Sequence, residues 1–412
     1  MEDKTLQRIA FITLHSCPLA RLGARDTGGM SVYVRRLAEG LGRLGFRVDI
    51  YTRAHNASEP QVVELDAGTR VIHIKAGHIA APKERLVRHL PAFLSRLKAF
   101  QRRERLKYAL VHSHYWLSGW AGNALAREWG VPHVTTFHTL AEIKSRAHIG
   151  AGEAWPRSAT ESQVVASVNR IVVSTAHEKG ALQRLYNADA EKIRVVPGGV
   201  DLARFQPGDQ RAARDRLGLN GHSTILYVGR LDPIKGLEVM MRTVAVMNAP
   251  RHIQLLVVGG GGDKDMEYVR MKRLACELAI QDRVEFLGSL SNDQLPTYYQ
   301  AADVCVVPSY YESFGLVALE AMACGTPVVA SRVPGLETII QDNRSGYLVP
   351  WHCPDAFADR LEILLVNESL RRSIGVNGRE RAAGMGWERT AVGVAGVYAD
   401  LGVAPVRQSP IE

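Results

Sequence analysis

Residues 8–51 read RIAFITLHSCPLARLGARDTGGMSVYVRRLAEGLGRLGFRVDIY, and they predict a complete β-α-β unit. The apolar run at 8–14 is typical of a buried strand. After a polar loop that ends in Gly-Gly at 28–29, apolar residues recur at helical spacings of 4, 3, 4 and 3, namely Met30, Val34, Leu37, Leu41 and Leu44. Gly45 is placed to end this helix, and residues 48–51 form the next strand. A strand, a helix and a strand in this order imply a parallel sheet.

Further strands follow in two series, which predict two such sheets. The first series comprises short apolar runs at 109–114, 132–138, 170–175 and 193–196. After a break at 198–207, the second comprises runs at 224–228, 254–258, 284–287, 304–307 and 328–330. Strands that alternate with helical segments are typical of doubly wound α/β domains. We therefore expect an α/β fold with two doubly wound, Rossmann-like domains that face each other across a cleft, 1–203 and 204–387, with a helix in 388–412 crossing back to the first.

The composition indicates an ordinary globular chain with a positive net charge. The chain has 412 residues, 46% of them hydrophobic and 23% charged, which is enough to bury a core in each domain. Lys and Arg number 51, and Asp and Glu number 42, so the net charge is +9 and suits an anionic ligand, a nucleic acid or an anionic membrane.

The segment 83–107 contains nine basic and two acidic residues, so its net charge is +7. A solvated helix face explains this charge as well as contact with a phosphate or a membrane does.

The cysteine content and the hydropathy of the chain indicate the cellular compartment of the protein. Five cysteines, an odd number without a CxxC pair, argue against a disulfide framework or a zinc ribbon and favour a reducing cytosol. The apolar run at 9–14 is short for the core of a signal peptide. No stretch approaches the roughly 18 apolar residues of a membrane-spanning helix. We expect a cytoplasmic protein, with weak peripheral contact at the inner membrane face left open.

The strongest functional signal is PSYYESFGLVALEAMACGTP at 308–327. Glu312 lies in a loop after a strand, and Glu320 follows eight residues later, about two helical turns along. Carboxylates accept hydrogen bonds from paired sugar hydroxyls, and the unpaired N–H groups of a first helical turn suit a phosphate between them. The segment could therefore hold a nucleotide sugar at three points. The alternative is one helix with a polar start and an exposed acid.

Three glycine-containing loops at strand ends are weaker signals. VGRLDPIKG at 228–236 carries Arg230 and Lys235 on one loop, where the two cations could neutralise a diphosphate or simply be solvated. DTGGM at 26–30 and the glycine run at 259–262 would let the backbone approach a ligand, although either could be only a turn. The first of these lacks the GxGxxG pattern of a dinucleotide site.

Histidines end two of the predicted strands. His112 and His114 form an HxH pair that could suggest a metal, but no carboxylate cluster accompanies them. We therefore expect no metal and no other cofactor. His138 lies at the carboxyl end of its strand and is the better candidate for a site residue.

Together these motifs resemble glycosyltransferase family 4, a group of retaining enzymes with the GT-B fold. The likeness runs from Ile9 to about Trp387, and its most specific part is the pair Glu312 and Glu320, which matches the family's E-x7-E motif. Within the family, the chain is most similar to the D-inositol-3-phosphate glycosyltransferases of mycothiol synthesis. That similarity rests on HSCPLA, DTGGMSVYV, VHSHYWLSG and the segment 309–320. Sucrose-phosphate synthases are more distant relatives with the same loops.

The resemblance implies a donor site for a nucleotide sugar, most simply a UDP-sugar. Catalysis would involve His138, Arg230, Lys235 and Glu312. The donor would contact Gly28, Gly29, Arg230, Lys235, Gly259, Glu312, Phe314, Gly315, Leu316, Val317 and Glu320. In this scheme the two cations hold the diphosphate, Glu312 holds the sugar hydroxyls and Glu320 holds the ribose.

The resemblance also implies an acceptor site in the first domain. A phosphate on the acceptor would be held by Lys83, Tyr115, Thr139 and Arg157. Ser31 stands where the inositol-phosphate enzymes usually have an Asn that binds an acceptor hydroxyl. The alternative for Arg157 is an ion pair with a nearby acid, Glu153 or Glu161.

These expectations describe a retaining hexosyltransferase that uses UDP-GlcNAc or UDP-glucose and a phosphorylated acceptor such as inositol phosphate. A hexose phosphate, a polysaccharide or a lipid-linked glycan are alternative acceptors. A nucleotide-sugar epimerase or hydrolase, or a non-enzymatic glycan- or nucleotide-binding module, would keep the donor loops without an acceptor site. We expect no nucleic-acid partner, and the oligomeric state is left open, with a dimer as one option.

Overall fold

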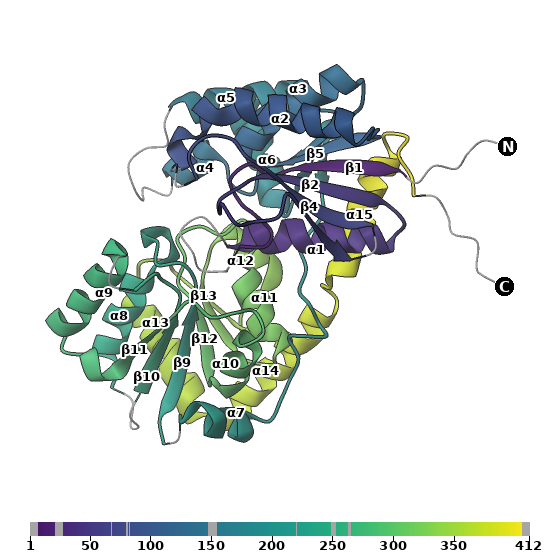
Figure 1. The fold of residues 1–412 in the computed structure, drawn as a ribbon. Helices are drawn as coiled ribbons and strands as arrows, with labels where there is room; N and C mark the ends of the chain where they lie inside the picture. The colour runs from purple at the N-terminus through teal and green to yellow at the C-terminus, as the bar shows by residue number, and fades with distance from the viewer. Residues whose placement is uncertain are drawn as a thin grey trace.

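The structure of the chain, a computed structural model, describes residues 7–20, 28–66, 68–79, 81, 83–146, 155–219, 221–248, 253–262 and 265–405. Two separate sheets make up two lobes (Figure 1). In the described residues, the sheet of the first lobe has eight strands in the order β3-β4-β2-β1-β5-β6-β7-β8. Their bounds are β1 Arg8–Ile12, β2 Arg47–Arg53, β3 Val62–Asp66, β4 Thr69–Ile74, β5 Leu110–His114, β6 His133–Thr136, β7 Arg170–Val173 and β8 Ile193–Val195.

The sheet of the second lobe has six strands in the part of the chain described, in the order β11-β10-β9-β12-β13-β14. Their bounds are β9 Ser223–Val228, β10 Ile253–Val258, β11 Val284–Gly288, β12 Val304–Val307, β13 Val328–Ser331 and β14 Tyr347–Val349. Every pairing in this sheet is parallel, as the succession of apolar strands and helical segments predicted.

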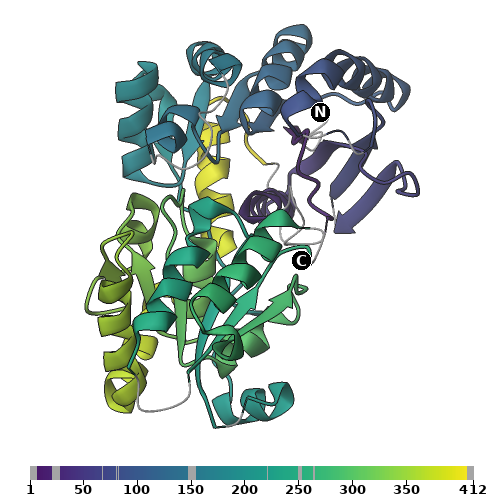
Figure 2. The same cartoon turned by 90° about the vertical axis from the view of Figure 1, so that its left-hand side faces the viewer.

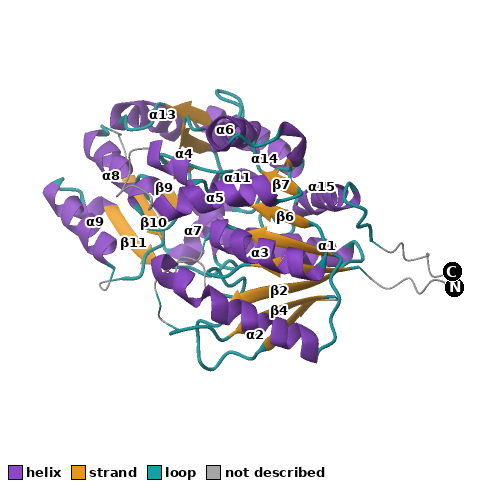
Figure 3. Cartoon of the chain, turned by 90° about the horizontal axis from the view of Figure 1, so that it is seen from above, coloured by secondary structure: helices purple, strands orange, loops and turns teal. Residues whose placement is uncertain are grey.

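Helices cover both faces of each sheet, as the view from above shows (Figure 3). In the first lobe they are α1 Gly29–Arg43, α2 Leu90–Arg103, α3 Trp116–Trp129, α4 Ala141–Arg146, α5 Trp155–Ser167 and α6 Ala176–Tyr186. In the second they are α7 Gln210–Leu217, α8 Leu237–Val246, α9 Met266–Glu277, α10 Leu295–Ala301, α11 Leu316–Ala323, α12 Pro334–Ile339, α13 Pro354–Val366 and α14 Glu368–Ala383. Apolar side chains fill the space between each sheet and its helices, so each lobe has its own core.

The last helix, α15 (Trp387–Ala399), returns to the first lobe and lies beside α1 (Figures 1 and 2). The two helices approach closely, since a Cβ atom added to Gly40 would lie only 2.7 Å from that of Ala391. Trp387 and Tyr398 belong to the core of the first lobe. We propose that the two lobes are the domains, 1–203 together with the returning helix in 388–412, and 204–387.

The order of the strands determines where a ligand can bind. In the first sheet β1 lies between β2 and β5, and in the second β9 lies between β10 and β12. Each of these strands is a point at which successive connections leave in opposite directions, and a crevice opens there at the carboxyl ends. The loops after β1, β5, β9 and β12 are therefore the ones expected to bind a ligand.

Three strands were not predicted from the sequence: β3, β4 and β14. Among the strands that the structure describes, the one antiparallel pairing involves two of these three, because β3 runs antiparallel to β4 at the edge of the first sheet. Among the described residues, no helix is long and apolar enough to cross a membrane. On the basic helix α2, Leu90, Phe93 and Leu97 point into the core.

Candidate active site

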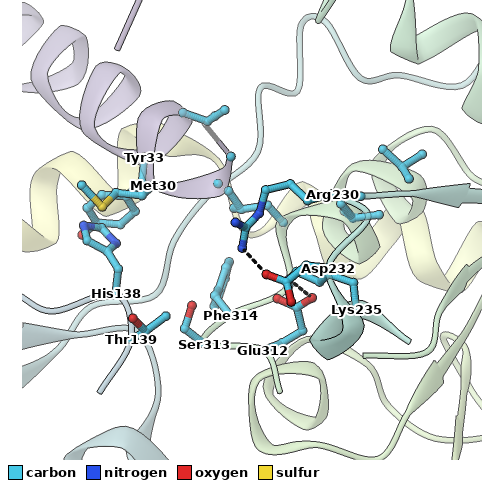
Figure 4. A pocket seen from close by; sticks show the side chains of 18 of the residues that line it. Met30, Tyr33, His138, Thr139, Arg230, Asp232, Lys235, Glu312, Ser313 and Phe314 are labelled. Carbon is cyan, nitrogen blue, oxygen red and sulfur yellow. Dashed lines mark hydrogen bonds and ion pairs between the residues drawn. The ribbon is translucent and has the colours of Figure 1, made fainter. Parts of the chain in front are cut away.

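A cavity of about 340 Å³ opens between the two domains at the carboxyl ends of both sheets. Its wall includes residues from the loops after β1, β5, β6, β9 and β12 and from the start of α1. Figure 4 shows His138 and Thr139 of the first domain on one side, and Arg230, Lys235 and Glu312 of the second on the other. The crevice expected from the strand order of each sheet therefore opens into the same cavity.

The loop between β9 and α8 holds the two cations at the cavity wall. Asp232 accepts a hydrogen bond from the backbone N–H of Ile234 at 3.2 Å and so caps the short 3-10 helix η3 (Pro233–Lys235). Gly236 ends this helix at φ 71°, and a Cβ atom there would lie 2.1 Å from the carbonyl oxygen of Pro308. This close approach requires glycine and places Lys235 beside the loop that follows β12.

Both cations already have carboxylate neighbours. Nζ of Lys235 lies 2.6 Å from Oε1 of Glu312, and Nη2 of Arg230 lies 3.5 Å from Oδ2 of Asp232. The Ser309 hydroxyl donates to the same Oε1 of Glu312 at 2.8 Å. These contacts hold the carboxylate of Glu312, which the resemblance assigns to the sugar hydroxyls. They also pair it with Lys235, which the resemblance assigns to the diphosphate.

The start of α11 and the two residues before it lie on the cavity wall, namely Phe314, Gly315, Leu316 and Val317. Gly315 precedes the helix at φ 104°, a conformation that residues with a Cβ rarely adopt. The N–H groups of the first turn have no partner within the helix, and the helix dipole adds partial positive charge. Across the cavity, a Cβ atom on Gly29 would lie 3.3 Å from the Leu316 side chain, so the domains approach each other here.

Glu320 lies one turn deeper on α11, also on the cavity wall. The hydroxyl of Tyr299 donates to Oε2 of Glu320 at 2.9 Å. Burial raises the pKa of the Glu320 carboxyl to about 7, although the hydrogen bond from Tyr299 acts in the opposite direction. This carboxyl group therefore changes charge near neutral pH.

His138 follows β6 and has φ 62°, which is unusual for a residue other than glycine. Its ring lies 5.0 Å from that of Tyr33 in an edge-to-face arrangement, and Nε2 lies 3.1 Å from Nδ1 of His114. Burial lowers the pKa of His138 to about 3. The imidazole is therefore neutral at physiological pH.

Three of the four residues expected to hold an acceptor phosphate lie together. Nη2 of Arg157 donates to the carbonyl oxygen of Thr139 at 2.8 Å and lies 2.9 Å from its hydroxyl oxygen. The guanidinium lies over the ring of Tyr115, 4.8 Å from its centre. All three residues line the cavity. The fourth, Lys83, begins the 3-10 helix η1 (Lys83–His89), but its side chain lies outside the described residues.

The alternative for Arg157 also holds in part. Its Nε donates to Oε1 of Glu161 at 2.8 Å, and both side chains are buried. Burial raises the pKa of Glu161, an effect that the charge of Arg157 opposes. Glu153, the other acid considered, lies outside the described residues. Arg157 is thus anchored by a carboxylate while its guanidinium reaches Thr139.

Ser31 does not lie on the cavity wall. It is 1% exposed, and its hydroxyl oxygen is 2.5 Å from that of Ser16, which does line the cavity. The contact between Ser31 and an acceptor therefore stays a prediction, and in the structure Ser31 is linked to the cavity wall through Ser16. Asp26 and Thr27 of the DTGGM motif lie outside the described residues.

Several wall residues were not selected from the sequence, among them His15, Ser16, Tyr33, Lys144 and Tyr311. For some of them, the position in the sequence beside a predicted strand or motif could have indicated that they line the cavity. His15 and Ser16 follow β1, and Tyr311 directly precedes Glu312 in the strongest motif. In the residues described, no group of three or more His, Cys, Asp or Glu side chains is arranged to hold a metal ion.

Known proteins share both halves of this architecture. Residues 27–204 match the model of Glycosyltransferase Family 4, and residues 209–381 match that of Glycosyl transferases group 1. A D-inositol 3-phosphate glycosyltransferase 2 from Catenulispora acidiphila is 42% identical over 95% of this chain and 94% of its own.

Solved structures show the same fold. The sucrose-phosphate synthase from Thermosynechococcus elongatus is 36% identical and superimposes with a TM-score of 0.89 over 96% of this chain and 99% of its own. The Anabaena protein HepE, solved in complex with UDP-glucose, is 18% identical with a TM-score of 0.77, over 96% and 100% of the two chains. With its two-domain cleft and these relatives, the chain belongs to glycosyltransferase family 4 and is a glycosyltransferase of the GT-B fold.

Proposed function

We propose that the enzyme transfers a sugar from UDP-GlcNAc or UDP-glucose to a hydroxyl group of a small phosphorylated acceptor. The observation that carries this proposal is the cluster of Arg157, Thr139 and Tyr115, which faces Lys235 and its neighbours across one cavity. An arginine beside hydroxyl groups favours a phosphate over a neutral sugar. The names of the relatives support inositol phosphate as the first candidate acceptor and a hexose phosphate as the second.

The donor side suits departure of a diphosphate. As the bond to the sugar breaks, negative charge grows on the leaving diphosphate. Arg230, Lys235 and the first turn of α11 surround the position where that charge would develop. Because these groups are held in place before the reaction, they stabilise the transition state more than water could. No metal ion takes part in this proposal.

The stereochemistry of the product depends on which group attacks the transferred sugar. Among the carboxylates of the cavity wall, Glu312 is held by Lys235 and Ser309 and Glu320 by Tyr299, and we propose neither as a nucleophile. We infer departure and attack on the same face of the sugar, with the leaving phosphate accepting the acceptor's proton. Closure of the cleft would keep water out and limit hydrolysis of the donor.

An α-linked nucleotide sugar should therefore yield an α-glycoside. Proton NMR of the freshly formed product reports the anomeric configuration before any later isomerisation. A β-glycoside would contradict the retaining assignment while leaving glycosyl transfer itself intact.

Glu320 predicts a pH dependence of donor binding. Ribose hydroxyls donate hydrogen bonds to a carboxylate, and the pKa of about 7 means that the carboxylate form is gained as the pH rises. Affinity for UDP-glucose should increase by up to roughly tenfold between about pH 6 and pH 8. Calorimetric titration measures this directly. Glu320→Gln should bind more weakly and without this dependence, and an unchanged profile in that variant would remove Glu320 from the ribose site.

We propose that the reaction takes place in the cytoplasm and that the basic helix α2 makes weak contact with an anionic membrane. Arg102 in its last turn and Arg105 just after it are exposed, whereas its large apolar residues point inward. Contact would therefore be purely electrostatic, with up to about 1 kcal/mol from each exposed base. Flotation with anionic liposomes at low salt should show weak binding that added salt reverses. An absence of binding under these conditions would refute the proposed membrane contact.

A further inference from the structure

Two histidines point to the same side of strand β5, because they are two residues apart. The rings of His112 and His114 lie 4.4 Å from each other. Both nitrogens of His112 have partners: Nδ1 is 2.6 Å from the hydroxyl oxygen of Tyr398, and Nε2 is 2.9 Å from that of Thr136. Packing and hydrogen bonding within the domain therefore explain His112.

The environment of His114 is different. The residue is 0% exposed, and its Nδ1 lies 3.1 Å from Nε2 of His138. Its other nitrogen, Nε2, is buried and has no hydrogen-bond partner among the described residues. One nitrogen of His114 is thus committed to a residue of the cavity wall, and the other is left unpaired.

The contact between the two rings holds a single proton. Burial lowers the pKa of both histidines, so both imidazoles are neutral. Either Nδ1–H of His114 donates to His138, or Nε2–H of His138 donates to His114. The second arrangement would leave an N–H group on the unpaired Nε2 of His114. Buried N–H groups without a partner are rarer than buried unpaired acceptors, so the first arrangement is favoured.

We propose that His114 is a positioning residue, which donates to His138 and thereby fixes it as the tautomer protonated on Nδ1. Because Nε2 of His138 is occupied by His114, Nδ1 is the ring nitrogen left for a ligand in the cavity. His138 then offers an N–H donor, whose natural partner is an oxygen of the donor sugar. This inference rests on the proposed function, in which His138 lies beside that sugar.

The backbone at His138 agrees with a ring held in one orientation. Its φ of 62° is costly for a residue with a Cβ, and such conformations persist where the surrounding structure imposes them. Here the constraints are the hydrogen bond to His114 and the edge-to-face contact with Tyr33. A ring held by these two contacts presents the remaining nitrogen in a fixed direction.

Nitrogen-15 NMR of the histidine-labelled wild-type enzyme tests the proposal without any substrate. The signals of His138 are identified by their loss in His138→Asn. We expect a protonated Nδ1 and an unprotonated Nε2 at His138. The opposite pattern, with the proton on Nε2, would overturn the proposal whatever the enzyme's activity.

Variants of His114 then separate positioning from folding. Asn carries its side-chain amide close to where Nδ1 of histidine lies, so His114→Asn should keep the donor, whereas His114→Leu removes it. With Leu, kcat should fall by roughly five- to tenfold at unchanged acceptor KM, as expected for one neutral hydrogen bond. With Asn, kcat should stay within about twofold of the wild type. Equal losses in both variants, with the proton pattern of His138 unchanged, would contradict the proposal.

The neighbouring histidine gives a matched control. His112→Asn alters a buried ring on the same strand that has no hydrogen bond to His138. It should lower Tm but leave the proton pattern of His138 as in the wild type. Failure of the wild-type enzyme to transfer any sugar would refute the proposed function alone, because the NMR pattern is read without turnover.

Discussion

Arg157→Ala should raise the acceptor KM by roughly a hundredfold or abolish turnover, while UDP still binds normally. A charge-assisted contact to phosphate contributes about 1.5–3 kcal/mol, and its loss would be felt only by the acceptor. The guanidinium reaches Thr139 and Tyr115 on the acceptor side, not the diphosphate loop. Kinetics with a saturating donor and varied acceptor, together with UDP titration, measure the two effects separately.

Folding must be checked in this variant, because Arg157 also neutralises the buried Glu161. Removing one partner of a buried pair typically costs about 3–5 kcal/mol. Thr139→Ala is the second variant, since it removes one hydroxyl and leaves that ion pair in place. Arg127→Ala, exposed on α3, is the control for loss of a positive charge. If Thr139→Ala and Arg157→Ala both folded and kept the wild-type acceptor KM, the phosphate pocket would be refuted.

Lys235→Ala should lower turnover by roughly ten- to a hundredfold. The ammonium group lies at the cavity wall and also holds Glu312 at 2.6 Å. Its loss would therefore weaken the clamp on the diphosphate and release the carboxylate assigned to the sugar. Initial rates across the UDP-sugars that the wild type accepts measure the effect.

A matched control for Lys235 is Arg273→Ala, in the same domain. The Arg273 side chain is 82% exposed on α9 and pairs only with Glu277 among the described residues. It should have wild-type kinetics. Wild-type kinetics for Lys235→Ala with every accepted donor would exclude this residue from the site.

Much of the fold could be predicted from the sequence because its central strands are apolar runs. β1 and β9 are buried on both faces, and their continuous hydrophobic stretches are visible without a structure. β3 was missed since it is a half-buried edge strand of sequence VVELD, and β14 because it has only three residues. Edge and short strands carry too little hydrophobic pattern to be distinguished from loops.

That the residues assigned to the donor lie together could be predicted more readily than that the residues assigned to the acceptor do. Glu312, Gly315 and Glu320 lie within one motif, so a single helix and its preceding loop place them together. The acceptor residues Tyr115, Thr139 and Arg157 come from three segments that only tertiary packing joins. The sequence could not show that Ser31 contacts Ser16, nor that His114 contacts His138, because both contacts depend on side-chain direction after folding.

The central claim is transfer of a sugar from a UDP-sugar to a phosphorylated acceptor. Its most direct test is release of UDP by the purified enzyme from UDP-GlcNAc and UDP-glucose, each with inositol phosphate, with a hexose phosphate, and with the dephosphorylated form of each acceptor. Donor alone measures hydrolysis. The account predicts rapid release with a phosphorylated acceptor, far slower release with its neutral parent, and little with donor alone. Equal rates with the phosphorylated and neutral acceptors would contradict it.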